Sequence, residues 1–175
     1  ERVMEIHVSQ SPYAVRLRLM WQNMREDVIA NFTRLKSNLS AKEFLERMET
    51  RYKLDAYHSL SIEGYRVTDE LINKVKSGVW KPDGEDMGSK NALAARGYWQ
   101  AFQEVKKSVS DIFEGSNSAE VAERDLSVWH SEMFIPCVTA GIIKPSDIVG
   151  YRSHQVYIRN SMHTPLNPDA LRDAM

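Results

Sequence analysis

Apolar residues recur at three- and four-residue steps along much of the chain, the spacing of amphipathic helices. The first such stretch, over about 13–37, has its apolar positions at Leu17, Trp21, Met24, Val28, Phe32 and Leu35. A longer one, over about 90–113, presents Leu93, Gly97, Tyr98, Ala101, Phe102, Val105, Val109 and Ile112 on one side. Gly97 within this apolar face favours close packing by another element, and a glycine that is merely tolerated there is the alternative. The pattern predicts a mainly α-helical fold.

Capping residues predict where further helices begin and end. Ser40 and Glu43 form a capping box that opens a helix over about 41–53. A short helix around 55–63 should end at Gly64, because glycine tolerates the left-handed conformation common just past a helix end. We expect further helices from Thr68 to Gly78, over about 119–139 with a kink at Pro136, and from Asn167 or Pro168 onward.

The periodicity changes between Gly150 and Asn160. This stretch holds the strand-forming residues Tyr151, Val156, Tyr157 and Ile158 and has no helical repeat. We expect a small two-stranded β-hairpin between about 148 and 160, with Val156 and Ile158 on one face and Tyr157 on the other. Glycine and proline over 81–84 and at Gly88 predict a surface loop.

Composition excludes several classes of protein. The chain has 175 residues, 42% of them hydrophobic, with a net charge of -1, which gives no electrostatic footprint for nucleic acid or an anionic membrane. No stretch approaches the roughly 20 apolar residues that span a bilayer. The single cysteine, Cys137, excludes an intrachain disulfide and lies in an apolar run that favours a buried, inert thiol. A cytoplasmic location is the simplest expectation.

Familiar catalytic patterns are absent from the sequence. It contains no glycine-rich phosphate loop, zinc-ligand spacing or nucleophile elbow. The five histidines form no ligand pattern, although His154 and His163 both lie in the hairpin region. We therefore predict no metal site. Composition and periodicity alone describe a soluble helical domain.

A short motif closes the predicted helix around 55–63. Ser59 and Glu63 are four residues apart and share one helix face, and Gly64 follows directly. At the carboxyl end of a helix, Glu63 lies at the unfavourable pole of the helix dipole, where a carboxylate favours a cationic partner from elsewhere. A solvated glutamate before a capping glycine is the alternative interpretation of these residues.

A second segment lies about ninety residues later. It comprises Gly150-Tyr151-Arg152, Val156, Ile158, Ser161, His163 and Pro165, and is preceded by Trp129-His130-Ser131-Glu132-Met133 and Ala140-Gly141-Ile142-Ile143. In order and spacing the two segments together resemble the Fic family. The first is similar to the family's inhibitory motif, a serine or threonine, three variable residues, glutamate, and glycine or asparagine. The second is similar to its substrate-docking flap.

The resemblance implies a Fic-like helical domain over 55–175, preceded by an N-terminal helical region over 1–54. It implies a protein adenylyltransferase that uses ATP with Mg²⁺ to transfer AMP to a hydroxyl side chain of a target protein. Glu63 would pair with an arginine of the catalytic loop and occupy the place of the γ-phosphate. Val156, Tyr157 and Ile158 would contact the target or the nucleotide. The alternative is that Val156 and Ile158 simply pack on the helices. A homodimer is compatible with the family; no membrane or nucleic-acid partner is expected.

One departure from the family pattern limits the transfer of roles. The active loop, H-P-F-x-x-G-N-G-R, is absent from these 175 residues. We assign no catalytic or metal-binding residue here, and expect a fragment that ends before the catalytic loop and is inactive alone. The alternative function is a non-catalytic helical interaction or antitoxin-like module that supplies Glu63 in trans.

Overall fold

The computed structural model describes residues 12–32, 39–79 and 89–174, and the chain divides into two compact units. These units are Glu1–Lys36 together with Gly150–Met175, and Ser37–Val149. Within the described ranges all regular secondary structure is helical. The prediction of a mainly α-helical fold is confirmed.

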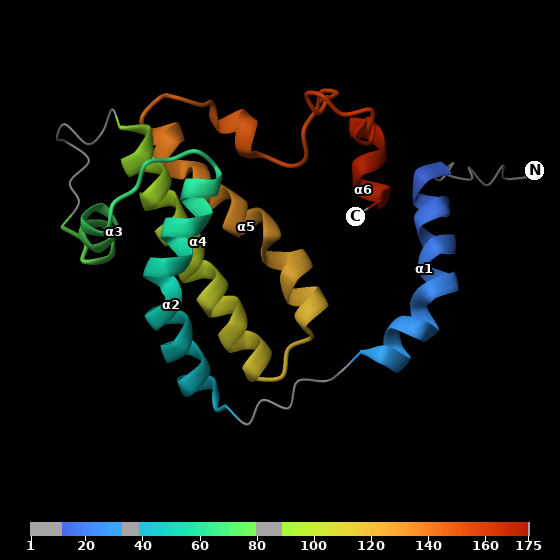
Figure 1. Cartoon of the computed structure of the whole chain (residues 1–175), viewed down its shortest axis with the longest axis horizontal. Coiled ribbons are helices and arrows are strands. Elements are labelled where there is room, and N and C mark those ends of the chain that lie inside the picture. Colours follow the sequence, from blue (N-terminus) through green and yellow to red (C-terminus); the bar gives the residue numbers. More distant parts are fainter. Residues whose placement is uncertain (1–11, 33–38, 80–88, 175) are drawn as a thin grey trace, which may run out of the picture. The chain divides into compact units, whose positions relative to one another are not determined.

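The unit Ser37–Val149 is built around one central helix. Its elements are α2 (Ala41–Ile62), α3 (Asp69–Lys76), α4 (Lys90–Phe113), α5 (Ser118–Thr139) and the short 3-10 helix η2 (Pro145–Ile148). Helix α4 contacts α2, α3 and α5, and the long helices α2, α4 and α5 lie side by side in Figure 1.

Polar caps begin these helices, and two of them, Ser40 and Thr68, are at the helix starts that the sequence predicts. Ser40, Thr68, Ser89 and Asn117 each accept a backbone N–H at a helix start. At Ser40 the capping box is complete, because the Glu43 carboxylate also accepts the Ser40 N–H at 2.8 Å. The loop predicted over 81–84 and at Gly88 lies outside the described residues.

One helix replaces the two that we predicted over 41–53 and 55–63. Helix α2 runs unbroken from Ala41 to Ile62, because no glycine or proline interrupts it and its core residues Tyr52, Ala56 and Leu60 continue the same buried face. The domain boundary that we placed between residues 54 and 55 lies inside this helix.

Aromatic side chains fill the contact between α2 and α4. Tyr52 is almost fully buried, and its ring centroid lies 4.7 Å from those of both Trp99 and Phe102. From α3, Ile72 and Val75 complete this core with no exposed surface. Rings at this separation pack favourably beyond their buried area, so α3 and α4 hold the middle of α2 in place.

Helices α4 and α5 approach each other closely at Gly97. A Cβ atom added there would lie 1.8 Å from the carbonyl oxygen of Met133 on α5. Only a residue without a side chain fits this contact. The close packing that the sequence indicated at Gly97 is confirmed.

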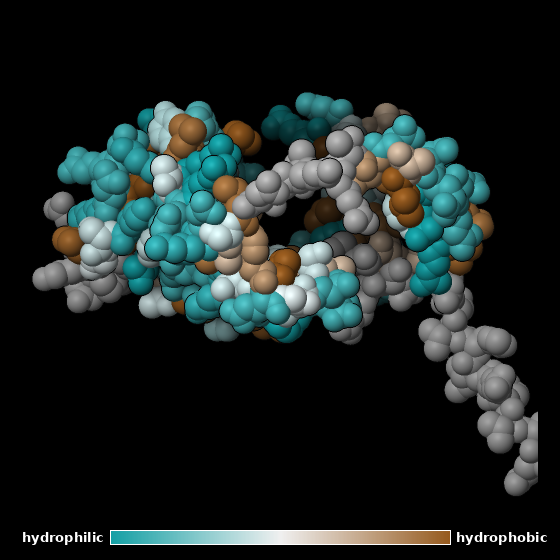
Figure 2. All heavy atoms as spheres, turned by 90° about the horizontal axis from the view of Figure 1, so that it is seen from below, coloured by the Kyte–Doolittle hydropathy of each residue, from teal (hydrophilic) through white to brown (hydrophobic). Residues whose placement is uncertain are grey.

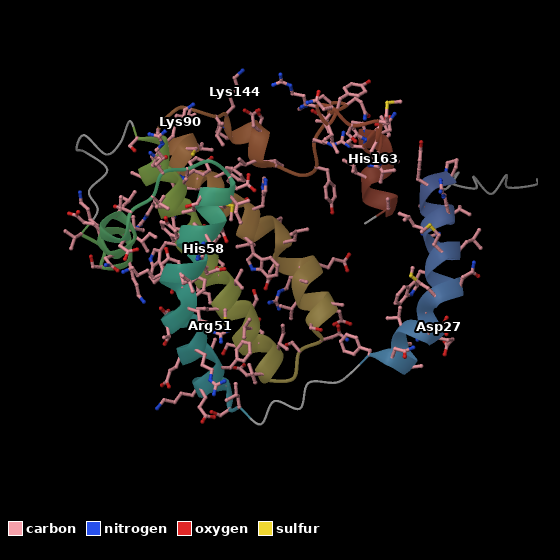
Figure 3. The ribbon with its side chains drawn as sticks, viewed as in Figure 1. Asp27, Arg51, His58, Lys90, Lys144 and His163 are labelled. Atoms are coloured by element: carbon pink, nitrogen blue, oxygen red, sulfur yellow. The ribbon has the colours of Figure 1, made fainter. Side chains whose placement is uncertain are left out.

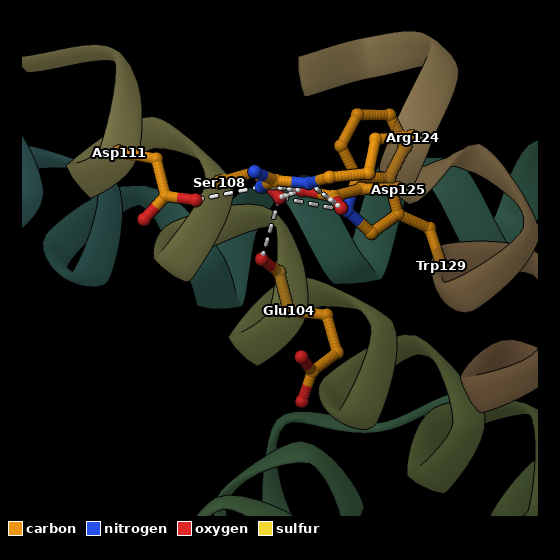
Figure 4. A network of polar contacts seen from close by, with 6 residues as sticks. All are labelled: Glu104, Ser108, Asp111, Arg124, Asp125 and Trp129. Carbon is orange, nitrogen blue, oxygen red and sulfur yellow. Dashed lines mark hydrogen bonds and ion pairs between the residues drawn. The ribbon is translucent and has the colours of Figure 1, made fainter. Parts of the chain in front are cut away.

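A polar network joins the same two helices further along (Figure 4). The buried Ser108 hydroxyl donates to Asp125 at 2.6 Å and accepts from the indole N–H of Trp129 at 3.1 Å. Arg124 donates to both Asp125 and Asp111. Hydrogen bonds from Arg124 and Ser108 lower the pKa of Asp125 to about 2.

The other unit contains α1 (Pro12–Asn31), the 3-10 helix η3 (Pro168–Ala170) and α6 (Leu171–Ala174). Helix α1 agrees with the predicted helix over 13–37 as far as Asn31, and residues 33–37 lie outside the described residues. Much of its apolar face is exposed, and Ala14 is buried. The helix predicted from Asn167 or Pro168 begins at Pro168 as η3.

The predicted β-hairpin is not present: residues 149–167 are irregular, with no strand. Carbonyl groups of this segment are bonded by side chains instead. Arg152 donates to the carbonyls of His154 and Leu166, and Gln155 donates to that of Pro165 at 2.8 Å. These local bonds compete with a strand ladder.

None of the described helices is both long enough and apolar enough to cross a membrane. The visible face in Figure 2 is mostly hydrophilic, with apolar side chains scattered in small groups.

Replacing Gly97 by alanine tests the contact between α4 and α5. We expect Gly97→Ala to destabilise the fold by about 1–3 kcal/mol, because the new methyl group overlaps the Met133 carbonyl. Helix propensity alone predicts a gain of roughly 0.5–1 kcal/mol. Urea unfolding followed by circular dichroism distinguishes this destabilisation from the stabilisation that helix propensity predicts. A stabilised variant would contradict the close approach of α4 and α5 at Gly97.

The lowered pKa of Asp125 predicts a loss of stability in acid. Since its folded pKa, about 2, lies below the usual value near 3.9, its contribution is complete above about pH 4 and disappears as the pH falls toward 2. We expect the melting temperature of the wild type to exceed that of Asp125→Asn near neutral pH and to converge with it in acid. A difference that does not change with pH would show that the carboxylate is not held in its charged form.

Candidate functional site

The carboxyl end of α2 places Glu63 at a fixed point of the backbone. Gly64 adopts a left-handed conformation with φ of 85°, and its N–H donates to the carbonyl of Ser61 at 3.0 Å. The N–H of Tyr65 donates to the carbonyl of Leu60 at 2.9 Å. This pair of bonds is a Schellman motif, in which Glu63 is the last residue before the chain turns.

The geometry accounts for the residue types of the motif. Glycine and asparagine are the residues that most readily adopt the left-handed conformation after a helix end, so the position after the glutamate accepts either. Leu60 is buried, and Tyr65 packs against the same core cluster. Glu63 lies between these two anchors and is exposed, as is its neighbour Ile62.

Ser59 is tied to α4 by a tyrosine. The Tyr98 hydroxyl donates to Asp55 Oδ2 at 2.6 Å. The Tyr98 hydroxyl oxygen also lies 3.3 Å from Ser59 Oγ. Since a phenol has one proton, and Asp55 accepts it, the Ser59 hydroxyl can donate to Tyr98 in turn. Burial, followed by the hydrogen bond to Asp55, raises the pKa of Tyr98 to about 12. His58, which directly precedes Ser59 on α2, is labelled in Figure 3.

Asp55, Ser59 and Glu63 follow one another at four-residue steps and so share a face of α2. Sequence reasoning found Ser59 and Glu63 but missed Asp55 and Tyr98. The four-residue spacing of Ser59 and Glu63, continued back by one step, could have identified Asp55. The sequence held no comparable signal for Tyr98, which was counted only as part of the apolar face of α4.

A second bond to α4 lies just beyond the helix end. The N–H of Arg66 donates to Asn91 Oδ1 at 2.9 Å. Asn91 and Tyr98 are seven residues apart on α4, about two turns, and so lie on nearly the same face. The stretch Ser59–Arg66, with Glu63 in its middle, is therefore bonded to α4 at both ends.

The six-residue pattern occurs a second time, as Ser110 to Gly115 at the end of α4. Its backbone bonds are the same: Glu114 N–H to the Ser110 carbonyl at 3.0 Å, and Gly115 N–H to the Ile112 carbonyl at 3.1 Å. Within the described residues the Ser110 hydroxyl makes no hydrogen bond. Asp111, inside this second pattern, accepts a hydrogen bond from Arg124 on α5 at 2.6 Å. The pattern alone therefore specifies a helix end, and the bonds to α4 both before and after the glutamate distinguish Glu63.

The predicted flap residues lie in the other unit. Val156 is half-buried, whereas Tyr157 and Ile158 are 77% and 52% exposed. The alternation that we expected, with Val156 and Ile158 on one face, requires a strand and so does not apply to this segment.

The side chains that bind metal ions in proteins are dispersed in the described part of the chain. Across residues 12–32, 39–79 and 89–174, no three His, Cys, Asp or Glu side chains come together to hold a metal ion. Cys137 is half-buried, and burial raises the pKa of its thiol, which disfavours the reactive thiolate.

No family model, curated protein or solved structure matches the chain.

The bond between Tyr98 and Asp55 can be tested by titration. We expect Asp55→Asn to lower the pKa of Tyr98 from about 12 toward the usual value near 10 without reaching it, because burial, the larger cause, remains. Since the folded pKa is raised, the contribution of Tyr98 to stability is complete below about pH 10 and is lost as the pH rises toward 12. NMR of ¹³C-labelled tyrosine measures this pKa; an unchanged titration in the variant would contradict the contact.

Proposed function

We propose that the chain is the inhibitory and target-binding part of a Fic-type protein adenylyltransferase, which transfers AMP from ATP to a hydroxyl side chain of a target protein. The observation that carries the proposal is the end of α2, where Glu63 is exposed on a helix end that is bonded to α4 on both sides. The order of this motif and the later segment around Val156–Ile158 supports the same family.

The electrostatics at Glu63 suit an inhibitory contact. Its carboxylate lies at the negative end of the α2 dipole, and among the described residues of its unit it makes no ion pair. An arginine brought to this point would gain a charge-assisted hydrogen bond and relieve the repulsion from the helix end. In the proposed enzyme that arginine belongs to the catalytic loop, and pairing with Glu63 keeps it from the γ-phosphate of ATP.

ATP with Mg²⁺ would be bound by the catalytic loop of the proposed enzyme. Within the described residues no three His, Cys, Asp or Glu side chains come together, and the sequence has no phosphate-binding loop. We therefore assign inhibition and target binding to this chain, but no chemical step, and expect it to act in the cytoplasm.

For target binding we propose the irregular segment around Val156, Tyr157 and Ile158. Tyr157 and Ile158 expose apolar surface, and peptide recognition by strand addition needs only main-chain groups in an extended stretch. Since this segment has no strand in the structure, pairing with the target would have to order it.

A non-catalytic module that supplies Glu63 in trans is the second candidate. It is favoured by the compactness of the unit Ser37–Val149, which has its own core and exposes Glu63. Added to a separate loop-bearing enzyme, the chain would then inhibit transfer, and Glu63→Gly would abolish the inhibition.

The two glutamates at helix ends provide a matched pair for the main test. In a protein that joins this chain to its catalytic loop, Glu63→Gly should raise self- or target modification by about tenfold or more, because the arginine becomes available to phosphate. Glu114→Gly changes the same residue type at the same helix-end geometry and should leave transfer unchanged. Transfer of labelled AMP at saturating ATP measures both variants.

Glu63→Asp completes the series, since it keeps the charge but withdraws it by one methylene. We expect transfer intermediate between those of the wild type and Glu63→Gly. Wild-type activity in Glu63→Gly, or an equal rise in Glu114→Gly, would overturn the proposed inhibition.

A further inference from the structure

The residues that bond the end of α2 to α4 lie outside the six-residue motif. Ser59 contacts Tyr98, and Arg66 contacts Asn91, so the seven intervening peptide bonds are fixed at both ends to one helix. We infer that Tyr98 and Asn91 are positioning residues, which hold Glu63 where it can meet its cationic partner. The inference rests on the proposed function of Glu63.

The bond at Tyr98 acts on Glu63 through Ser59. The Ser59 side chain reaches the Tyr98 oxygen, while the Ser59 carbonyl accepts the N–H of Glu63 at 3.3 Å. Tyr98 is itself held by the charged Asp55 at 2.6 Å, and hydrogen bonds to charged groups are stronger than neutral ones. Hydrogen bonding to α4 thus restrains the last turn of α2, although helix ends ordinarily fray.

The bond at Asn91 fixes the chain after the turn. Its side-chain oxygen accepts the Arg66 N–H at 2.9 Å, directly after Tyr65 has closed the Schellman motif. Without this acceptor the backbone bonds of the turn would remain, but the chain from Arg66 onward would lose its bond to α4. Together the two bonds limit the positions that the Glu63 carboxylate can take, which lowers the entropic cost of pairing.

Glu114 provides the comparison within the same molecule. Its helix end has the same backbone bonds, and in the described residues its motif serine has no bond to a neighbouring helix, although Asp111 is bonded to Arg124 on α5. If the bonds to α4 restrain the end of α2, their loss should speed amide exchange at Gly64 and Tyr65 and leave exchange at Gly115 and Ser116 unchanged.

The first experiment is amide hydrogen exchange by NMR on the 175-residue chain. We expect Tyr98→Phe to raise the exchange rates of Gly64 and Tyr65 by about tenfold, the effect of one lost charge-assisted hydrogen bond on local opening. The rates of Gly115 should not change. Tyr57→Phe removes a hydroxyl from the exposed side of α2 and is the matched control. Equal acceleration at both helix ends would indicate a general loss of stability and overturn the inference.

Asn91 provides a second and independent pair of variants, which decides the question if Tyr98→Phe fails to fold. Asn91→Ala removes the acceptor for the Arg66 N–H and should accelerate exchange at Arg66 by several-fold to tenfold. Asn91→Asp keeps an oxygen in the same place and should restore the slow rate. Failure of Asn91→Asp to restore protection would contradict the positioning role.

The second experiment measures AMP transfer in a protein that joins this chain to its catalytic loop. Tyr98→Phe and Asn91→Ala should each raise transfer by several-fold, and neither should raise it further in a Glu63→Gly background, because both act through Glu63. If Glu63→Gly raises transfer and the other two do not, the positioning inference is wrong and the proposed function stands. If Glu63→Gly has no effect, the proposed function is wrong, and the inference falls with it.

Discussion

The arrangement of the unit Ser37–Val149 depends on α4 being packed from several sides at once. Toward α5 it presents Gly97, where a single methyl group would collide with the backbone of Met133. Toward α2 and α3 it presents large aromatic side chains that surround Tyr52. The small residue lets α5 approach closely, while the aromatic ones hold α2 by buried apolar area. Because α4 is packed in this way, a segment bonded to it at two points is restrained relative to the core.

The same constraint underlies the proposed role of the end of α2. A serine, three residues, a glutamate and a glycine describe a helix that stops in a Schellman motif, and the chain contains two such stops. At Glu114 the end of α4 is bonded to α5 before the glutamate, because Asp111 accepts a hydrogen bond from Arg124. At Glu63 the same stop is bonded to α4 before and after the glutamate, so the carboxylate is carried by a restrained segment. A restrained carboxylate at the negative pole of a helix is suited to meet an arginine of another segment.

Local features were predictable from the sequence, and long-range ones were not. Ser40 and Gly64 specify helix ends through bonds to their own neighbours, so the sequence predicted both. The prediction of a break between two helices near residue 54 was wrong. No glycine or proline required a break there, and the buried face of α2 continues through this position. The hairpin around Val156 was wrong because strand propensity ignores the side-chain bonds of Arg152 and Gln155 to nearby carbonyls. Tyr98 lies 39 residues from Ser59, and only the packing of α2 on α4 brings them together.

The most direct test of the account is the distance between the Glu63 carboxylate and the nearest guanidinium group in an experimental structure of this chain joined to the catalytic loop of the proposed enzyme. With no nucleotide bound, we predict an ion pair within about 4 Å, which is the usual limit for such contacts. With a non-hydrolysable ATP analogue bound, the same guanidinium should contact the γ-phosphate instead. A Glu63 carboxylate that faces solvent in both states, as Glu114 does at the end of α4, would contradict the account.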